Sequence, residues 1–222
     1  MYERILRILS LEELDLIQNK KILIVGLGGV GGAAFEALVR TGIKSITVID
    51  NDEFEISNLN RQLLSTRSYI GKNKAFSAYM MAKDINPDVL VDYKEMFLDE
   101  SNIDDLNIGH YDYVLDCCDS VNTKVALIEK CVHFGVKIIT SMGTGNRLDP
   151  TKLIITDIWR TNYDPLAKKI RSLLRKRNIN SKIMVVTSTE IPRKSSDGVG
   201  SLAFVPNCAG FFMASFVIND II

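Results

Sequence analysis

The chain has 222 residues, of which 46% are hydrophobic and 24% charged, a balance typical of a globular protein with one ordinary domain. Its 27 Lys and Arg residues equal its 27 Asp and Glu residues, so no net field draws the chain to nucleic acid or a membrane. The sequence shows no signal-peptide pattern, no run of about 18 apolar residues and no Cys-x-x-Cys pair. We therefore expect a reduced, cytoplasmic protein with no zinc ribbon and no stable membrane association.

The first third of the chain predicts a helix and then a strand–helix–strand unit. Ser10 and Glu13 have the spacing of a capping box and predict a helix over residues 11–18. An apolar strand over 22–25 and a helix over 29–41 lead to a strand over 45–50. A loop over 52–67 follows, and a helix over 73–85 ends ahead of Pro87, since the residue before proline disfavours helix.

The rest of the chain repeats this alternation and then changes. Strands are predicted over 89–93, 111–116 and 137–141, with a helix over 121–134. Beyond Pro150 we expect a strand over 153–159, a basic helix over 165–177, a strand over 183–187, a flexible polar loop over 194–200 and an apolar helix over 208–222.

This alternation predicts an α/β fold: a mainly parallel sheet with helices on both faces, plus a C-terminal strand/helix extension. We expect a single domain over 1–222, made of an N-terminal helical segment (1–20), a nucleotide-binding core (21–145) and the extension (146–222).

A glycine-rich turn follows the first predicted strand. Gly26-x-Gly28-x-x-Gly31 allows the backbone to turn sharply and to approach a phosphate, while the next helix offers unpaired N–H groups and its positive dipole end. Asp50 follows about 20 residues later, at the end of the second strand, where an acidic residue commonly accepts from ribose hydroxyls. The pattern indicates a nucleotide pocket; the alternative is a glycine turn that serves only close helix–strand packing.

Three further residues favour ATP over NAD. Arg61 offers a planar fork to phosphate oxygens, and Lys74 brings a mobile point charge to the start of the next helix. Asp119 follows a buried strand at the ligand-binding edge of such sheets, where a carboxylate suits Mg²⁺ beside phosphates. The alternatives are that Arg61 and Lys74 are solvated surface charges and that Asp119 is the N-cap of the next helix.

These motifs resemble the ubiquitin-activating-like (ThiF-type) adenylyltransferases over roughly residues 1–145. The matching segments are Gly26–Gly31, Ile49–Asp52, Ser57–Gln62, Lys74 and Asp116-x-x-Asp119-Ser120. The resemblance implies a Rossmann-like fold and a homodimer that adenylates a carboxylate with ATP and Mg²⁺.

By the same resemblance, Asp50 holds the ribose, Arg61 and Lys74 hold the phosphates, and Asp119 organises Mg²⁺ and the reacting phosphate. Arg4 matches an arginine that reaches into the partner subunit's site. The remaining expected nucleotide contacts are Gly26, Gly28, Gly29, Gly31, Asp52, Asn58 and Asn60.

The second half of the chain resembles the tRNA threonylcarbamoyladenosine dehydratase branch of these enzymes. The similar segments are Ser141–Thr151, Asp157-Ile158, Thr161, Asp164–Arg171, Ser188–Pro192 and Gly200-Ser201. The branch implies a tRNA substrate whose threonyl carboxylate is activated and closed into a ring, with the loop around Asn146 and Arg147 near the acyl group. The paired zinc cysteines of sulfur-carrier activators and the catalytic-cysteine domain of larger ubiquitin activators are missing from this sequence.

Several questions stay open at this point. The cysteines are expected to pack as small hydrophobes in the core or pocket wall: Cys117, Cys118, Cys131 and Cys208. A basic cluster either contacts tRNA phosphates or is a solvated helix face: Lys168, Lys169, Arg171, Arg175, Lys176 and Arg177. The last apolar helix is expected in the core or a dimer interface.

Alternative functions are activation of a ubiquitin-like sulfur carrier, a non-catalytic nucleotide-binding module and, as the weakest, an NAD-dependent dehydrogenase. A sulfur-relay or other helper protein is a further possible partner.

Overall fold

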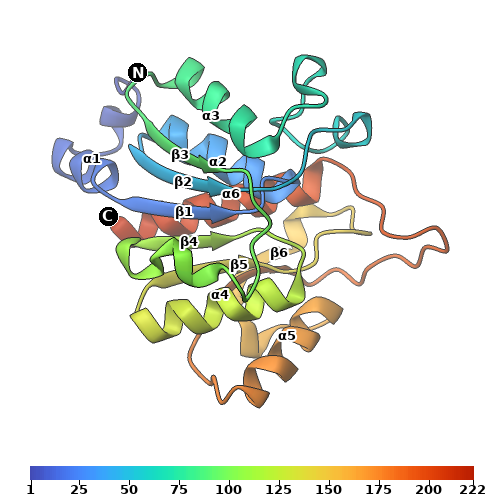
Figure 1. The fold of residues 1–222 in the computed structure, drawn as a ribbon. Helices are drawn as coiled ribbons and strands as arrows, with labels where there is room; N and C mark the ends of the chain where they lie inside the picture. The colour runs from blue at the N-terminus through green and yellow to red at the C-terminus, as the bar shows by residue number, and fades with distance from the viewer.

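A seven-stranded sheet forms the centre of the computed structural model, which describes residues 1–222 (Figure 1). The strand order is β3-β2-β1-β4-β5-β7-β6, and every neighbouring pair is parallel except β6 and β7. The bounds are β1 Lys21–Val25, β2 Ser45–Ile49, β3 Leu90–Lys94, β4 Tyr113–Asp116, β5 Lys137–Ser141, β6 Leu153–Asp157 and β7 Met184–Ser188. The prediction of a mainly parallel α/β sheet is confirmed.

Six α-helices surround the sheet. They are α1 Leu11–Gln18, α2 Gly29–Thr41, α3 Lys74–Ile85, α4 Val121–Phe134, α5 Pro165–Lys176 and α6 Phe204–Ile221. Alternate residues of β1 serve the two faces: Ile22 and Ile24 pack in a core with α2 and α6, whereas Leu23 and Val25 pack in a second core with α4 and α5. Figure 1 shows helices α4 and α5 in front of the sheet and helices α2 and α6 behind it. Helices on both faces are therefore confirmed.

Most predicted boundaries agree with the structure within two residues, and the capping box is formed: Ser10 Oγ accepts from the Glu13 N–H, and Glu13 accepts from the Ser10 N–H. The last helix begins at Phe204 rather than at 208, because Pro206 lies in its first turn, where the missing N–H costs no helical bond. The strand predicted over 153–159 ends at Asp157, whose side chain accepts from the Trp159 N–H and starts a 3₁₀ turn over Ile158–Arg160.

Helix α6 is the single helix long and apolar enough, by length and composition, to cross a membrane, with a mean hydropathy of 1.3 and 44% of that window buried. The core helices of other proteins also satisfy these two criteria, so length and composition are weak evidence for a membrane span. Gly210 lies directly on α2, since a Cβ there would sit 2.2 Å from the Val30 carbonyl oxygen. The contact agrees with the expectation of a core helix.

Helix α2 runs from the carboxyl edge of the sheet, where the parallel strands end, to the opposite edge. Its N-terminus follows the glycine turn at the carboxyl edge of β1, and its 13 residues span about 20 Å. At its far end, the Tyr2 ring lies against Gly42, where an added Cβ would be 3.0 Å from the ring. The Tyr2 hydroxyl also accepts from the Asn86 amide at 3.1 Å. The N-terminal segment therefore lies at the opposite edge from the glycine turn of its own chain.

Candidate functional site

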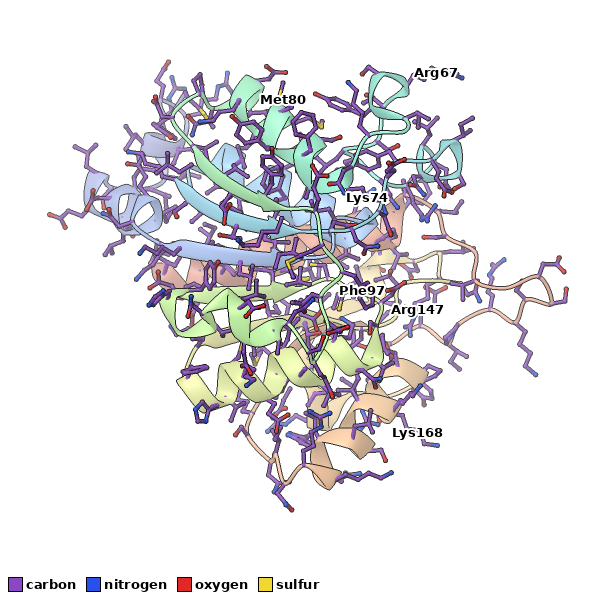
Figure 2. All side chains as sticks on the ribbon, in the orientation of Figure 1. Arg67, Lys74, Met80, Phe97, Arg147 and Lys168 are labelled. Atoms are coloured by element: carbon purple, nitrogen blue, oxygen red, sulfur yellow. The ribbon has the colours of Figure 1, made fainter.

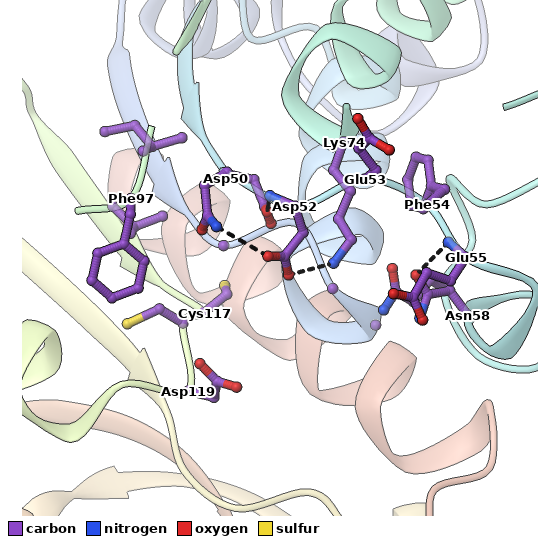
Figure 3. A pocket seen from close by; sticks show the side chains of 18 of the residues that line it. Asp50, Asp52, Glu53, Phe54, Glu55, Asn58, Lys74, Phe97, Cys117 and Asp119 are labelled. Carbon is purple, nitrogen blue, oxygen red and sulfur yellow. Dashed lines mark hydrogen bonds and ion pairs between the residues drawn. The ribbon is translucent and has the colours of Figure 1, made fainter. Parts of the chain in front are cut away.

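A cavity of about 870 Å³ opens where β1, β2 and β4 end, and 27 residues line it (Figure 3). Most of the predicted site residues are among them: Gly26, Gly28, Gly29, Asp50, Asp52, Asn58, Arg61, Lys74 and Asp119. Gly31, Asn60 and Arg4 are not. The structure thus brings together residues that the sequence separates by almost a hundred positions.

The glycine turn is shaped by two close approaches. Gly26 has φ +87°, and a Cβ there would lie 2.9 Å from the Cys118 nitrogen, while a Cβ on Gly31 would lie 1.8 Å from the Gly26 oxygen. Gly28 precedes the first residue of α2, and no side chain caps that helix. Gly31 thus fits the packing alternative, while Gly28 leaves first-turn N–H groups of α2 available to an anion beside the cavity.

Asp50, Asp52 and Lys74 form the polar floor of the cavity. The Asp50 carboxylate accepts the Leu27 N–H at 2.6 Å and the Asp52 N–H at 2.9 Å, which fixes the glycine turn to the end of β2. Burial raises the pKa of Asp50, and the nearby Lys74 charge and these N–H groups oppose the rise. Lys74 Nζ lies 2.9 Å from Asp52 Oδ2, and the lysine side chain is 8% exposed. Lys74 is therefore a buried, oriented cation rather than a solvated surface charge.

Asn73 orients Lys74, and the sequence analysis did not assign it a role. Its side-chain oxygen accepts from the Ala75 and Phe76 N–H groups as the N-cap of α3, and its amide donates to the backbone carbonyl of Asp50 at 3.3 Å. Asparagine at the first position of the helix predicted over 73–85 was the available signal, since asparagine is a preferred N-cap. It joins the start of α3 to the end of β2, and so places Lys74 beside Asp52.

Arg61 lies in the loop between β2 and α3, and residues of the same loop hold its side chain. Its Nη1 donates to the Ser57 carbonyl at 2.9 Å and to the Asn60 side-chain oxygen at 3.0 Å. Asn60 in turn donates to the Ser201 carbonyl at 2.9 Å. Asn58 is 7% exposed and accepts from the Glu55 N–H. Asn60 thus orients Arg61 and ties this loop to the segment before α6, whereas Arg61 itself borders the cavity.

Asp119 lies in the loop between β4 and α4, and its carboxylate faces the cavity (Figure 3). It is exposed, and its side chain makes no hydrogen bond or ion pair within the chain. The helix N-cap is Ser120, whose hydroxyl accepts from the Thr123 N–H at 3.4 Å. The alternative reading of Asp119 as the N-cap is therefore wrong, and its carboxylate is available to a ligand.

An apolar wall completes the cavity. Phe97 is 56% exposed and lines it with Met96 and Leu98, in the segment between β3 and β4. Figures 2 and 3 show its ring beside the polar floor. The sequence analysis missed this wall because the segment has neither helical nor strand periodicity. The exposed ring offers a flat apolar surface to a ligand.

Arg147 does not line the cavity, although we expect its loop near the acyl group. It is 2% exposed and donates to the carbonyls of Ser188 at 2.7 Å and Glu190 at 2.8 Å. It also pairs with Asp164 at 3.5 Å. Since Asp164 is the N-cap of α5, the guanidinium joins the loop after β5 to the ends of α5 and β7. Its role in the structure is therefore to hold these segments together.

Two thiols also line the cavity. Cys117 Sγ lies 3.7 Å from Met213 Sδ, and the Cys118 thiol donates to Asp116 Oδ1 at 3.1 Å. Burial, with the Asp116 charge, raises the pKa of both thiols, and it raises the pKa of Cys131 in the core to about 12. Thiols with raised pKa values stay protonated near neutral pH and are poor nucleophiles. As expected, these three cysteines are wall and core residues.

Comparison with known proteins gives consistent relatives. The model of the ThiF family matches residues 2–164. A Bacillus subtilis protein named tRNA threonylcarbamoyladenosine dehydratase is 34% identical, with 95% of this chain and 90% of that protein covered.

Two solved structures of the Escherichia coli tRNA N6-threonylcarbamoyladenosine dehydratase, TcdA, share the fold. The complex with AMP has a TM-score of 0.92 at 36% identity and covers 97% of this chain and 91% of that chain. The complex with ATP has a TM-score of 0.93 at 34% identity and covers 99% and 93%.

The buried thiols generate the first prediction. With iodoacetamide at neutral pH, Cys117, Cys118 and Cys131 should stay unmodified in the folded protein, because their raised pKa values leave almost no thiolate. Peptide mass spectrometry measures the labelling, and the urea-unfolded protein, in which all four cysteines react, is the control. Rapid alkylation of Cys117 or Cys118 in the folded protein would contradict the assignment.

Proposed function

The chain belongs to the ThiF family, and on that basis we propose that it is an ATP-dependent enzyme that cyclises threonylcarbamoyladenosine in tRNA by removing water. One observation carries the proposal: a single cavity combines the uncapped N-terminus of α2, Arg61, Lys74 and Asp119. The names of the relatives and their complexes with ATP and AMP support it.

The first proposed step is adenylation of the threonyl carboxylate. A carboxylate oxygen attacks the α-phosphorus of ATP in line, the bond to the β-phosphate oxygen breaks, and pyrophosphate leaves. Both reactants are anionic, so positioning and charge neutralisation dominate the catalysis. Lys74 and Arg61, with the N–H groups at the start of α2, supply positive potential at the cavity. We assign the ribose hydroxyls to Asp50.

The second proposed step closes the ring within the substrate. A neighbouring atom of the carbamoyl group attacks the activated carbonyl, AMP leaves, and the attacking atom loses its proton. The net result removes the elements of water at the expense of ATP. An intramolecular nucleophile needs no enzyme thiol, which agrees with the raised pKa values of Cys117 and Cys118.

Mg²⁺ fits this site as a companion of the nucleotide. The chain has no group of three or more His, Cys, Asp or Glu side chains able to hold a metal ion by themselves. Mg²⁺ commonly binds through one or two carboxylates together with substrate phosphates and water. The unpaired Asp119 carboxylate suits that arrangement, and we propose that it holds the ion, which would neutralise phosphate charge.

We further propose a homodimer in which Arg4 serves the partner's site. Arg4 follows Tyr2, which lies against the far end of α2, about 20 Å from the glycine turn. Arg4 therefore lies far from its own cavity, and only a second copy can use it there. Apolar side chains near it also stay exposed, among them Ile8 (83%) and Leu11 (73%).

For the tRNA surface we propose the exposed face of α5. Three cations of the predicted cluster are engaged in packing: Arg171 donates to Thr161, Arg175 lies over the Trp159 ring, and Arg177 pairs with Glu100 and Glu129. Lys168, Lys169 and Lys176 are exposed and make no such contact (Lys168 is labelled in Figure 2). These three are the residues we propose for phosphate contacts. A tRNA substrate would also place the protein in the cytoplasm.

The decisive experiment for this function uses the modified nucleoside. Incubation with ATP, Mg²⁺ and threonylcarbamoylated tRNA should yield the nucleoside lighter by one water, as read by mass spectrometry. Pyrophosphate exchange that depends on a carrier protein with a C-terminal Gly-Gly, and not on tRNA, would favour the sulfur-carrier alternative. ATP binding with neither reaction would favour the non-catalytic module.

A matched pair of variants tests the nucleotide site by ATP binding. Lys74→Met should raise the Kd for ATP by roughly tenfold or more, the cost of one lost charged contact. Lys72→Met is the control, since Lys72 lies outside the cavity with its ammonium 4.9 Å from the Tyr69 ring centroid. Equal affinities for the two variants in isothermal titration would exclude Lys74 as a phosphate ligand.

Subunit mixing tests the dimer proposal. Arg4→Ala and Asp119→Ala should each retain only a small residual activity as homodimers, whereas co-refolding them in equal amounts should restore about a quarter of wild-type activity, because half the dimers then hold one complete site. Size-exclusion chromatography verifies the dimers. A mixture no more active than its two components would place Arg4 outside the partner's site.

Charge reversal tests the tRNA surface. Lys168→Glu/Lys169→Glu should weaken tRNA binding. It should also lower the slope of log Kd against log salt concentration by about two, one for each phosphate contact. Lys20→Glu/Lys21→Glu, at the amino edge of β1, is the matched control. Binding is measured by fluorescence anisotropy across salt concentrations, and an equal effect of both pairs would locate the RNA elsewhere.

A further inference from the structure

A completely buried ion pair lies beneath the loop that carries Asp119. Lys124 Nζ is 3.2 Å from both carboxylate oxygens of Asp116, and the two side chains are 1% and 0% exposed. Thr140 completes the cluster, since its hydroxyl donates to Asp116 and lies 3.2 Å from Lys124 Nζ. Burial lowers the pKa of Lys124, but the charge of Asp116, the nearby thiols of Cys117 and Cys118 and the hydrogen bond to Asp116 together outweigh burial, so the pKa is raised and the ammonium stays charged.

The cluster fixes both ends of the loop. Asp116 is the last residue of β4, Lys124 lies in the first turn of α4 and Thr140 belongs to β5. Asp116 Oδ1 also accepts from the Cys118 N–H at 3.3 Å, and the Cys117 N–H donates to the Val25 carbonyl at 2.8 Å. The loop backbone is therefore held by Asp116 at its start.

This hold extends to the glycine turn. The backbone of Cys117 and Cys118 packs directly on Gly26, where an added Cβ would meet it at 2.9 Å to 3.0 Å. The Asp119 side chain has no partner of its own in the chain, so the region that its carboxylate can reach is set by the loop backbone and not by side-chain contacts. A path of contacts thus leads from Lys124 through Asp116 and Cys118 to Asp119.

Stability alone does not account for a buried pair of this kind. The cost of removing both charges from water offsets most of their attraction, and apolar residues of similar volume are often as stable or more so. The charged pair does something that an apolar pair does not: Asp116 offers directed acceptors to the loop, and Lys124 and Thr140 hold those acceptors in one orientation.

We propose that Lys124 is a positioning residue that acts through Asp116 to hold the Asp119 carboxylate where the adenylation step requires it. The assignment rests on the proposed function. It concerns the placement of a catalytic group, because Lys124 itself does not line the cavity.

The test replaces both charges at once, in the full-length protein. Asp116→Leu/Lys124→Met removes the pair without leaving one charge buried and unpaired, so the thermal midpoint should stay within a few degrees of wild type. With tRNA substrate, kcat should fall by about 100-fold, the effect of a misplacement of about 1 Å, while KM for ATP changes less than about threefold. A kcat within threefold of wild type, or a rise in KM alone, would overturn the proposal.

A double-mutant cycle shows whether the effect runs through Asp119. If it does, adding the pair replacement to Asp119→Ala should lower the residual rate no further, because the group being positioned is already gone. Additive losses would overturn the proposal. Arg147→Met/Asp164→Leu, a second pair at 1% and 0% exposure but outside the cavity, is the matched control and should retain ATP binding.

Two further measurements distinguish a failure of the positioning proposal from a folding defect and from a failure of the proposed function. If the double variant does not fold, Thr140→Val decides: it removes one buried hydroxyl and should lower kcat several-fold at constant KM, and an unchanged kcat overturns the proposal. If wild type itself shows no tRNA-dependent ATP consumption, the proposed function fails, and the same variants assayed by ATP-dependent pyrophosphate exchange with the carrier protein then test the positioning role.

Discussion

The site depends on a contact between two backbones with no side chain between them. The turn after β1 and the loop after β4 meet at Gly26, where a Cβ would come within 2.9 Å of the Cys118 nitrogen. Because parallel strands β1 and β4 are neighbours, their carboxyl ends present these loops at one edge of the sheet. The contact places the α2 N-terminus and Asp119 on either side of one cavity. The other side chains of the site are arranged around it.

The cations of the cavity are oriented by the protein itself. Lys74 is almost fully buried against Asp52, and Arg61 is held by the Ser57 carbonyl and by Asn60. Groups held in this way lose little side-chain entropy when an anion arrives and need little reorganisation during the reaction. Asp52 is 60% exposed, so Lys74 can exchange it for a phosphate, and Asp52 can turn to water, at modest cost. The arrangement suits a site that binds and releases a polyphosphate.

Local rules allowed much of the fold and of the site to be predicted. The capping box at Ser10, the glycine turn and the alternation of apolar strands and helices act over a few residues, and the structure agrees with them closely. Ser120 rather than Asp119 caps α4, a choice that two adjacent capping residues leave undecided in sequence.

The burial of charged residues required the fold. Lys124 lies on the same face of its helix as Ile128 and Cys131, which was a signal that the lysine is buried. Its partners Asp116 and Thr140, however, come from two strands, β4 and β5. Arg147 lies in a loop without periodicity, and its acceptors are main-chain carbonyls, which carry no sequence signature. Such residues are recognised only once the strand order is known.

The strand order also explains why the C-terminal extension is part of the enzyme core. The ThiF match ends at residue 164, yet β7 lies between β5 and β6 and completes the sheet. Helix α6 contributes Val205, Met213 and Val217 to the same core as Ile22 and Val30. Removing the extension would therefore expose the sheet face and α2, the helix whose N-terminus borders the cavity. Strand β7 and helix α6 thus join the extension to the segment matched by the family model in one sheet and one core, which is the packing that the predicted single domain requires.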